Sequence, residues 1–71
     1  PRDARLQYLA GVACLKRQLW GKAQQLLTQA IPHLTDAGLR ASAWRHLAAL
    51  AERRNDGEAA AEAWKKAALA H

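Results

Sequence analysis

Residues 43–67 read AWRHLAALAERRNDGEAAAEAWKKA, and their pattern recurs in the rest of the chain. On both sides of the turn Asn55-Asp56-Gly57, apolar residues recur at i, i+3, i+4 and i+7, which places each set on one face of a helix. The first set is Trp44, Leu47, Ala48 and Ala51, and the second is Ala60, Ala63, Trp64 and Ala67. The pattern predicts a helical hairpin in which alanines let the two backbones approach closely and the tryptophans fill the space on either side.

The same pattern occurs 37 residues earlier in the chain. Gly11, Cys14, Ala23, Leu27 and Ala30 stand where the later copy has Ala48, Ala51, Ala60, Trp64 and Ala67. Tetratricopeptide repeats run for roughly 34 residues and carry a Trp-x2-Leu-Gly segment followed by Ala-x3-Phe. Trp44–Ala48 followed by Ala60–Trp64 resembles that pattern, and the two copies together cover nearly the whole chain.

The resemblance implies an all-α fold of two tetratricopeptide-like hairpins, whose four antiparallel helices stack as a short right-handed solenoid. We expect one domain over residues 1–71, with repeat one at about 3–34 and repeat two at about 36–70. Such arrays usually need three or more repeats, so we interpret the chain as a fragment of a longer array. The expected helices span about 3–17, 21–31, 36–54 and 56–70.

Local signals set these helix boundaries. Asp3, Asp36 and Asp56 are expected as amino-terminal caps. Pro32 lacks a backbone donor, so we expect the second helix to stop near Ile31. Asn55 tolerates the left-handed conformation that commonly follows the end of a helix.

We expect the first helix to turn its main apolar stripe toward the second. This inward stripe is Leu6, Leu9, Ala10, Ala13 and Cys14, and it faces Ala23, Leu26, Leu27 and Ala30. Without a preceding repeat, Leu6 and Leu9 with parts of Leu26 and Leu34 are also expected on an uncovered side. Exposed apolar patches mark interaction sites, so we predict contacts through this amino-terminal end, either in a symmetric homodimer or by exchange of a helix across the Pro32 linker.

The charge suggests a second class of function. Eleven Lys and Arg against six Asp and Glu give a formal net charge of +5, which is compatible with a basic helical nucleic-acid-binding fragment. However, Lys16-Arg17, Arg53-Arg54 and Lys65-Lys66 end predicted helices, where cations complement the helix dipole. No aromatic residue interleaves with a basic stripe, as stacking on bases requires. We therefore predict no nucleic-acid partner.

The sequence contains no recognisable catalytic constellation. Ser42 and His46 are four residues apart on one helix, but nothing nearby supplies an oxyanion hole. The single cysteine, Cys14, cannot form an internal disulfide, and His33, His46 and His71 are scattered. We predict that the chain is not an enzyme and has no catalytic residues, metal or cofactor.

In tetratricopeptide arrays, the first helix of each repeat lines a concave groove that receives a peptide or a partner helix. The resemblance places Arg5, Tyr8, Val12, Leu15 and Lys16 in this groove, together with Ser42, Arg45, Ala49, Glu52 and Arg53. Tyr8 and Val12 stand where the chaperone-binding members would have Lys and Asn, so that subtype is not expected. The basic, partly apolar groove implies an acidic protein or peptide partner.

A narrower resemblance concerns two strings, Leu19–Gln24 (LWGKAQ) and His46–Glu52 (HLAALAE). Both are similar to the carboxy-terminal repeats of the proteobacterial HemY proteins. Those proteins are anchored in the inner membrane through helices at the amino terminus, and they are associated with late steps of haem or protoporphyrin synthesis. The resemblance implies a soluble interaction fragment of such a parent, with direct haem binding as a further alternative. No apolar run here approaches the ~18 residues of a membrane span.

Overall fold

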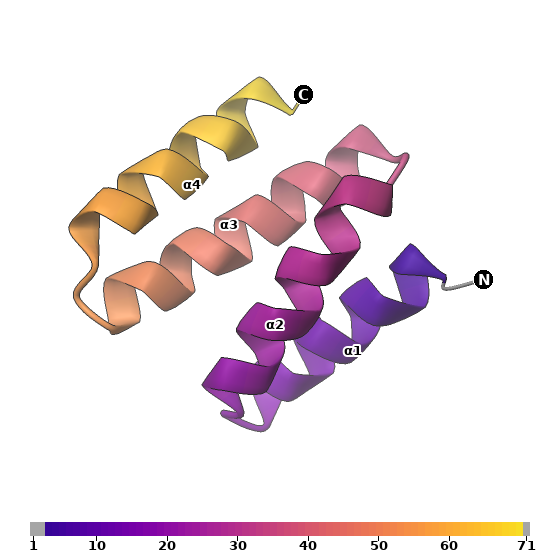
Figure 1. Cartoon of the computed structure of the whole chain (residues 1–71), viewed down its shortest axis with the longest axis horizontal. Helices are drawn as coiled ribbons and strands as arrows, with labels where there is room; N and C mark the ends of the chain where they lie inside the picture. Colours follow the sequence, from indigo (N-terminus) through magenta and orange to yellow (C-terminus); the bar gives the residue numbers. More distant parts are fainter. Residues whose placement is uncertain (1–2, 71) are drawn as a thin grey trace. The chain divides into compact units, whose positions relative to one another are not determined.

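The computed structural model describes residues 3–70, and over that range the chain is all-helical. It contains four α-helices and one short 3-10 helix (Figure 1). These are α1 Ala4–Lys16, α2 Trp20–Ala30, η1 Ile31–His33, α3 Ala37–Arg53 and α4 Gly57–Leu69. No strand occurs within the described range. The all-α prediction is therefore confirmed.

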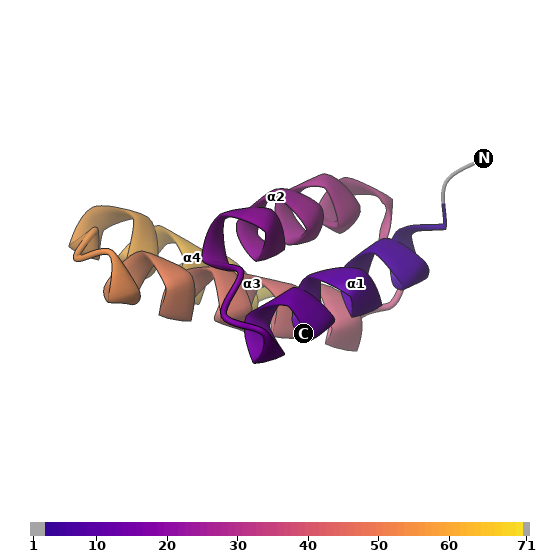
Figure 2. The same cartoon turned by 90° about the horizontal axis from the view of Figure 1, so that it is seen from below.

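The helices pack as two pairs of sequence neighbours. α1 packs against α2, with η1 at the end of α2, and α3 packs against α4. In each pair the two helices run antiparallel and are joined by a short turn, as Figures 1 and 2 show. The chain accordingly divides into two compact units between Leu34 and Thr35. We call them the first pair and the second pair.

Aspartate side chains begin three of the four α-helices, as the sequence predicts. Asp3 accepts a hydrogen bond from the backbone N–H of Arg5 at 2.9 Å. Asp36 and Asp56 cap α3 and α4 by accepting, each at 3.1 Å, from the N–H three residues later. Such caps satisfy donors that have no partner inside the helix, and each contributes about 1 kcal/mol. α2 differs, because its cap residue Leu19 has no side chain that can accept.

Helices α1 and α3 end in the same backbone geometry. Gln18 and Asn55 both have φ of 62°, in the left-handed region. In each case the N–H of this residue donates to the carbonyl oxygen three residues earlier at 3.0 Å. The N–H of the next residue donates to the carbonyl oxygen five residues earlier at 2.9 Å. This is the Schellman arrangement, which satisfies the last carbonyls of a helix. The left-handed prediction at Asn55 is confirmed, whereas a glutamine carries no comparable signal.

α2 ends close to the predicted position. The α-helix stops at Ala30, one residue earlier than expected, and Ile31–His33 forms a 3-10 turn that contains Pro32. The Leu34 N–H closes this turn by donating to the Ile31 carbonyl at 3.2 Å. α2 also begins one residue earlier than predicted, at Trp20 instead of Gly21.

The core of the first pair is centred on Gly11 of α1 and Leu27 of α2. Leu27 is fully buried. A Cβ atom added to Gly11 would lie only 2.9 Å from Leu27 Cγ, so the two helices approach this closely because Gly11 has no side chain. The other buried apolar residues of these elements are Ala4, Tyr8, Ala23, Ala30, Ile31 and Leu34.

The predicted inward stripe of α1 is wrong. Leu6 and Leu9 are 64% and 57% exposed, Ala10 and Ala13 are also exposed, and Cys14 is half-buried. The helix buries Ala4, Tyr8 and Gly11 instead. The physical reason is the close approach at Gly11, which lets Leu27 be enclosed completely. The expectation that Leu34 lies on an uncovered side is also wrong, since it is 3% exposed.

The core of the second pair consists mainly of alanines. Its buried residues are Ala41, Ala43, Ala48, Leu50, Ala51, Ala60, Ala63 and Ala67. The predicted stripes are confirmed at their alanines, while Trp44 and Leu47 are half-buried. Trp64 is 42% exposed, so it fills the space beside the alanine contact only in part. Its indole N–H bonds to a carboxylate at the surface, and this keeps the ring partly in solvent.

Candidate functional site

The predicted groove residues of the first pair lie along α1. Arg5 and Lys16 are exposed, and Val12 and Leu15 are half-buried. Tyr8 is only 8% exposed and belongs to the buried face of α1. The side chains of this set that can reach a partner are therefore the two cations and the edges of Val12 and Leu15.

The predicted groove residues of the second pair lie along α3. Arg45, Ala49, Glu52 and Arg53 are exposed, and Ser42 is half-buried. Tyr8 of α1 and Ser42, Arg45 and Arg53 of α3 each already take part in an interaction within the structure. Of this set, Arg45, Ala49, Glu52 and Arg53 combine exposure with a predicted role in the groove, and that role stays a prediction.

Two tryptophans link α3 and α4 on the surface of the second pair. Trp64 Nε1 donates to Glu52 Oε2 at 3.1 Å. Lys66 Nζ lies 4.8 Å from the ring centroid of Trp44, within the range of a cation–π contact. Lys66 also lies 4.0 Å from a Glu62 oxygen, one turn earlier on α4. Glu52, predicted to line a groove, is thus engaged with α4. Its position next to the last residue of α3 gave no indication of this contact.

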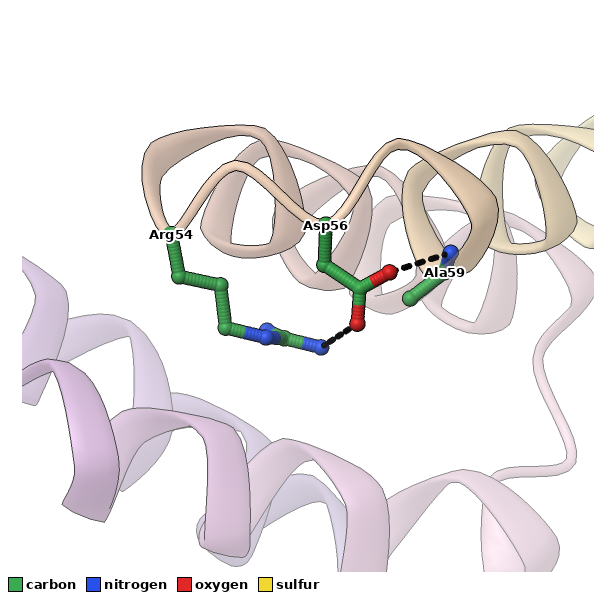
Figure 3. Close-up of polar contacts among 3 residues, drawn as sticks. All are labelled: Arg54, Asp56 and Ala59. Carbon is green, nitrogen blue, oxygen red and sulfur yellow. Dashed lines mark hydrogen bonds and ion pairs between the residues drawn. The ribbon is translucent and has the colours of Figure 1, made fainter.

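The turn between α3 and α4 is held by one carboxylate with two partners (Figure 3). Asp56 Oδ1 accepts from the Ala59 N–H at 3.1 Å, and Oδ2 lies 3.6 Å from Arg54 Nη2. A shallow open depression beside it is lined by Asp56, Glu58, Ala59 and Glu62. The carboxylate of Asp56 caps α4 and pairs with Arg54 in the turn. The presence of this acidic residue in the lining of the depression therefore has a structural explanation.

The remaining candidate ligands and nucleophiles are dispersed. His46 is half-buried on α3, and its pKa is lowered from 6.5 by burial and, secondarily, by the nearby charge of Arg45. Cys14 is half-buried, His33 is exposed, and His71 lies outside the described residues. Among residues 3–70, no group of three or more His, Cys, Asp and Glu side chains is placed to hold a metal ion.

Charge is divided unequally between the two pairs. Residues 1–34 hold five Lys and Arg but a single carboxylate, Asp3, which gives +4. Residues 35–71 hold six Lys and Arg and five Asp and Glu, which gives +1. Most of the formal charge of +5 therefore lies in the first pair. Neither the total charge nor the position of cations at helix ends indicated this unequal division.

No protein-family model, curated protein or solved structure matches this chain. None of the helices within residues 3–70 combines the length and the apolar character needed to cross a bilayer.

Proposed function

We propose that this chain is a protein-interaction module built from two tetratricopeptide-like repeats, and that it performs no catalysis. The observation that carries the proposal is the recurrence of one helix–turn–helix design after 37 residues. The left-handed residues Gln18 and Asn55 and the buried alanines Ala23 and Ala60 occupy equivalent places in the two copies. Repeated helical units of this length expose long helix faces, and proteins built from them use such faces to bind partners.

The parent that we propose is a HemY-like protein of the bacterial inner membrane, associated with haem or protoporphyrin synthesis. The support is the likeness of two strings, Leu19–Gln24 and His46–Glu52. Part of the first string has a structural reason, since Ala23 is fully buried and the Leu19 N–H closes the end of α1. Gly21 has no atom within 4 Å of an added Cβ, so packing does not require a glycine there.

Site-specific photo-crosslinking tests the proposed groove face. A photoreactive amino acid at Ala49 sits on the predicted groove side of α3, and one at Ala61 is the matched control, because both positions are exposed alanines within helices of the second pair. Incubation with a proteobacterial membrane extract should give a discrete crosslinked protein from position 49 and none from position 61. Equal labelling from both positions, or none from either, would contradict the assignment.

The concentration of charge in the first pair favours one alternative function, the binding of nucleic acid. Phosphate contacts release counterions, so such binding weakens steeply as salt rises. Titration of a labelled mixed-sequence DNA at about 50 mM and about 200 mM salt separates the two functions. We expect no binding at the higher salt; a fall in affinity between the two salts that becomes shallower in Lys16→Gln would support the alternative.

A further inference from the structure

α1 carries a second apolar face, on the side away from its buried residues. Leu6, Leu9, Ala10 and Ala13 are all exposed and recur at i, i+3, i+4 and i+7. This spacing is the one by which a helix presents a continuous stripe to another element. The core of the first pair uses the opposite side, at Ala4, Tyr8 and Gly11. We call the exposed residues the leucine stripe.

The leucine stripe has a basic border. Arg5 and Lys16 are exposed beside it on α1, and Arg17 follows at the end of the helix. The one carboxylate of residues 1–34, Asp3, is committed to the cap of α1, where it accepts from the N–H of Arg5. Asp3 therefore offsets one of the five Lys and Arg of residues 1–34, and the other four are not balanced within the first pair.

We propose that the leucine stripe binds an acidic amphipathic helix of a partner protein. Leucines of the partner would pack against Leu6 and Leu9, while the small Ala10 and Ala13 would let the two helices approach closely. Glutamates or aspartates flanking the apolar face of the partner would meet Arg5 and Lys16. In this mode of recognition an amphipathic helix lays its apolar face against the protein, and the residues that make contact recur at i, i+3, i+4 and i+7.

Charge and apolar area together favour an acidic partner helix over two other occupants, a second copy of the chain and an anionic membrane. A second copy of the chain would bring one unit of charge +4 against another, which opposes association. An anionic membrane would match the charge, but interfacial binding scales with buried apolar area. The leucine stripe offers two leucines and two alanines and no aromatic residue. A partner helix gains from both the leucines and the charged border.

The inference rests on the proposed function, since it assumes that the chain binds proteins, but it concerns α1 of the first pair, whereas the groove position Ala49 lies on α3 of the second pair. Two synthetic peptides serve as probes for the 71-residue chain. One has leucines on one helical face and glutamates elsewhere, and the other has lysines in place of the glutamates. Fluorescence anisotropy should show that the acidic peptide binds and that the lysine peptide does not.

Paired variants locate the binding site. Leu6→Gln with Leu9→Gln should weaken binding of the acidic peptide by about tenfold or more, because two apolar anchors are lost. Arg5→Gln with Lys16→Gln should weaken binding and reduce its salt dependence. Leu69→Gln, at a leucine of α4 that is 72% exposed, is the control and should leave binding unchanged. Thermal melts should be similar for all four proteins, because every substituted side chain is exposed.

Several results would overturn the inference. These are failure of the acidic peptide to bind, equal binding of both peptides, and binding that the leucine variants do not weaken. A dimer of the wild-type chain in sedimentation equilibrium that Leu6→Gln with Leu9→Gln dissociates would instead assign the stripe to a second copy. Vesicles of anionic lipid that bind only wild type would assign it to a membrane. A crosslink at position 49 without peptide binding would leave the proposed function standing and remove this inference alone.

Discussion

The two helix pairs share their backbone turns and differ in what fills the space between the helices. Gly11 and Leu27 of the first pair correspond, after 37 residues, to Ala48 and Trp64 of the second. Leu27 is completely buried and Trp64 is 42% exposed. Gly11 lets α1 and α2 enclose the aliphatic side chain of Leu27. In the second pair Ala48 stands at the equivalent position, and the indole of Trp64 is partly exposed at the surface.

This difference extends to the polar contacts on the surface. In the first pair, Gln7 Nε2 donates to Gln29 Oε1 at 2.9 Å. In the second pair, charged groups meet the two indoles, through Glu52 with Trp64 and Lys66 with Trp44. The two pairs thus share the backbone geometry of their turns but neither their interiors nor their surface charge.

The strongest test of the comparison is truncation at the equivalent positions Leu27 and Trp64. Leu27→Ala should lower the free energy of unfolding by about 2–5 kcal/mol, because a fully buried leucine leaves a cavity. Trp64→Ala should cost less, about 1–2 kcal/mol, since its ring is already partly solvated. Urea unfolding followed by circular dichroism measures both. Equal losses would mean that the two interiors do not differ as described.

The second test concerns the alanine packing of α4. Ala60 is 4% exposed, so Ala60→Leu should overpack the second pair and destabilise it by roughly 1–3 kcal/mol. The neighbouring Ala61 is exposed, and Ala61→Leu should be nearly neutral. Thermal melts of the two variants should separate clearly. If their midpoints coincide, the packing face of α4 has been assigned incorrectly.

Two glycine substitutions should have effects of opposite sign. Gly11→Ala places a Cβ 2.9 Å from Leu27 Cγ, and this clash should outweigh the gain in helix propensity, for a net loss of about 1 kcal/mol. Gly21→Ala meets nothing within 4 Å and should gain about 0.5–1 kcal/mol. Chemical denaturation compares both with wild type. A stabilised Gly11→Ala protein would show that the helices of the first pair can move apart without cost.

The smallest expected effect is a pH dependence contributed by His46. Burial, and then the charge of Arg45, lowers the pKa of this imidazole from 6.5, so the folded chain binds its proton more weakly than the unfolded chain. The stability contribution is complete above pH 6.5 and is lost as the pH falls from there through the lowered pKa of the folded state. Melting midpoints measured across that window should decline more steeply for wild type than for His46→Gln. Parallel declines would contradict this role.

Helix positions were predictable because their signals are local. An aspartate before α1, α3 and α4, Pro32 after α2 and Asn55 before α4 act over a few residues, and each is found in its expected role. Gln18 takes the same left-handed conformation as Asn55 without a residue preference that would reveal it. There the helix-end hydrogen bonds, and not the side chain, determine the backbone.

The buried face of α1 could not be predicted from periodicity, because two apolar stripes compete. Leu6 and Leu9 make the exposed stripe the more hydrophobic of the two, yet the fold buries the one that contains Gly11. The choice depends on how closely α2 can approach, which is a property of both helices together. The same difficulty affected the candidate groove, where Arg5, Lys16 and Ala49 are exposed as predicted but Tyr8 is part of the core.

The short turn at Gln18 also affects when the first pair can fold during protein synthesis. The packing of Gly11 against Leu27 spans only 16 residues of sequence, and such local helical contacts form within microseconds to milliseconds. On a ribosome that adds roughly 5–20 residues per second, residues 35–71 follow the first pair out of the exit tunnel over about 2–7 s. The first pair can therefore close before α4 has emerged. During those seconds Leu6 and Leu9 are already exposed to solvent, where a chaperone or a binding partner can meet the nascent chain.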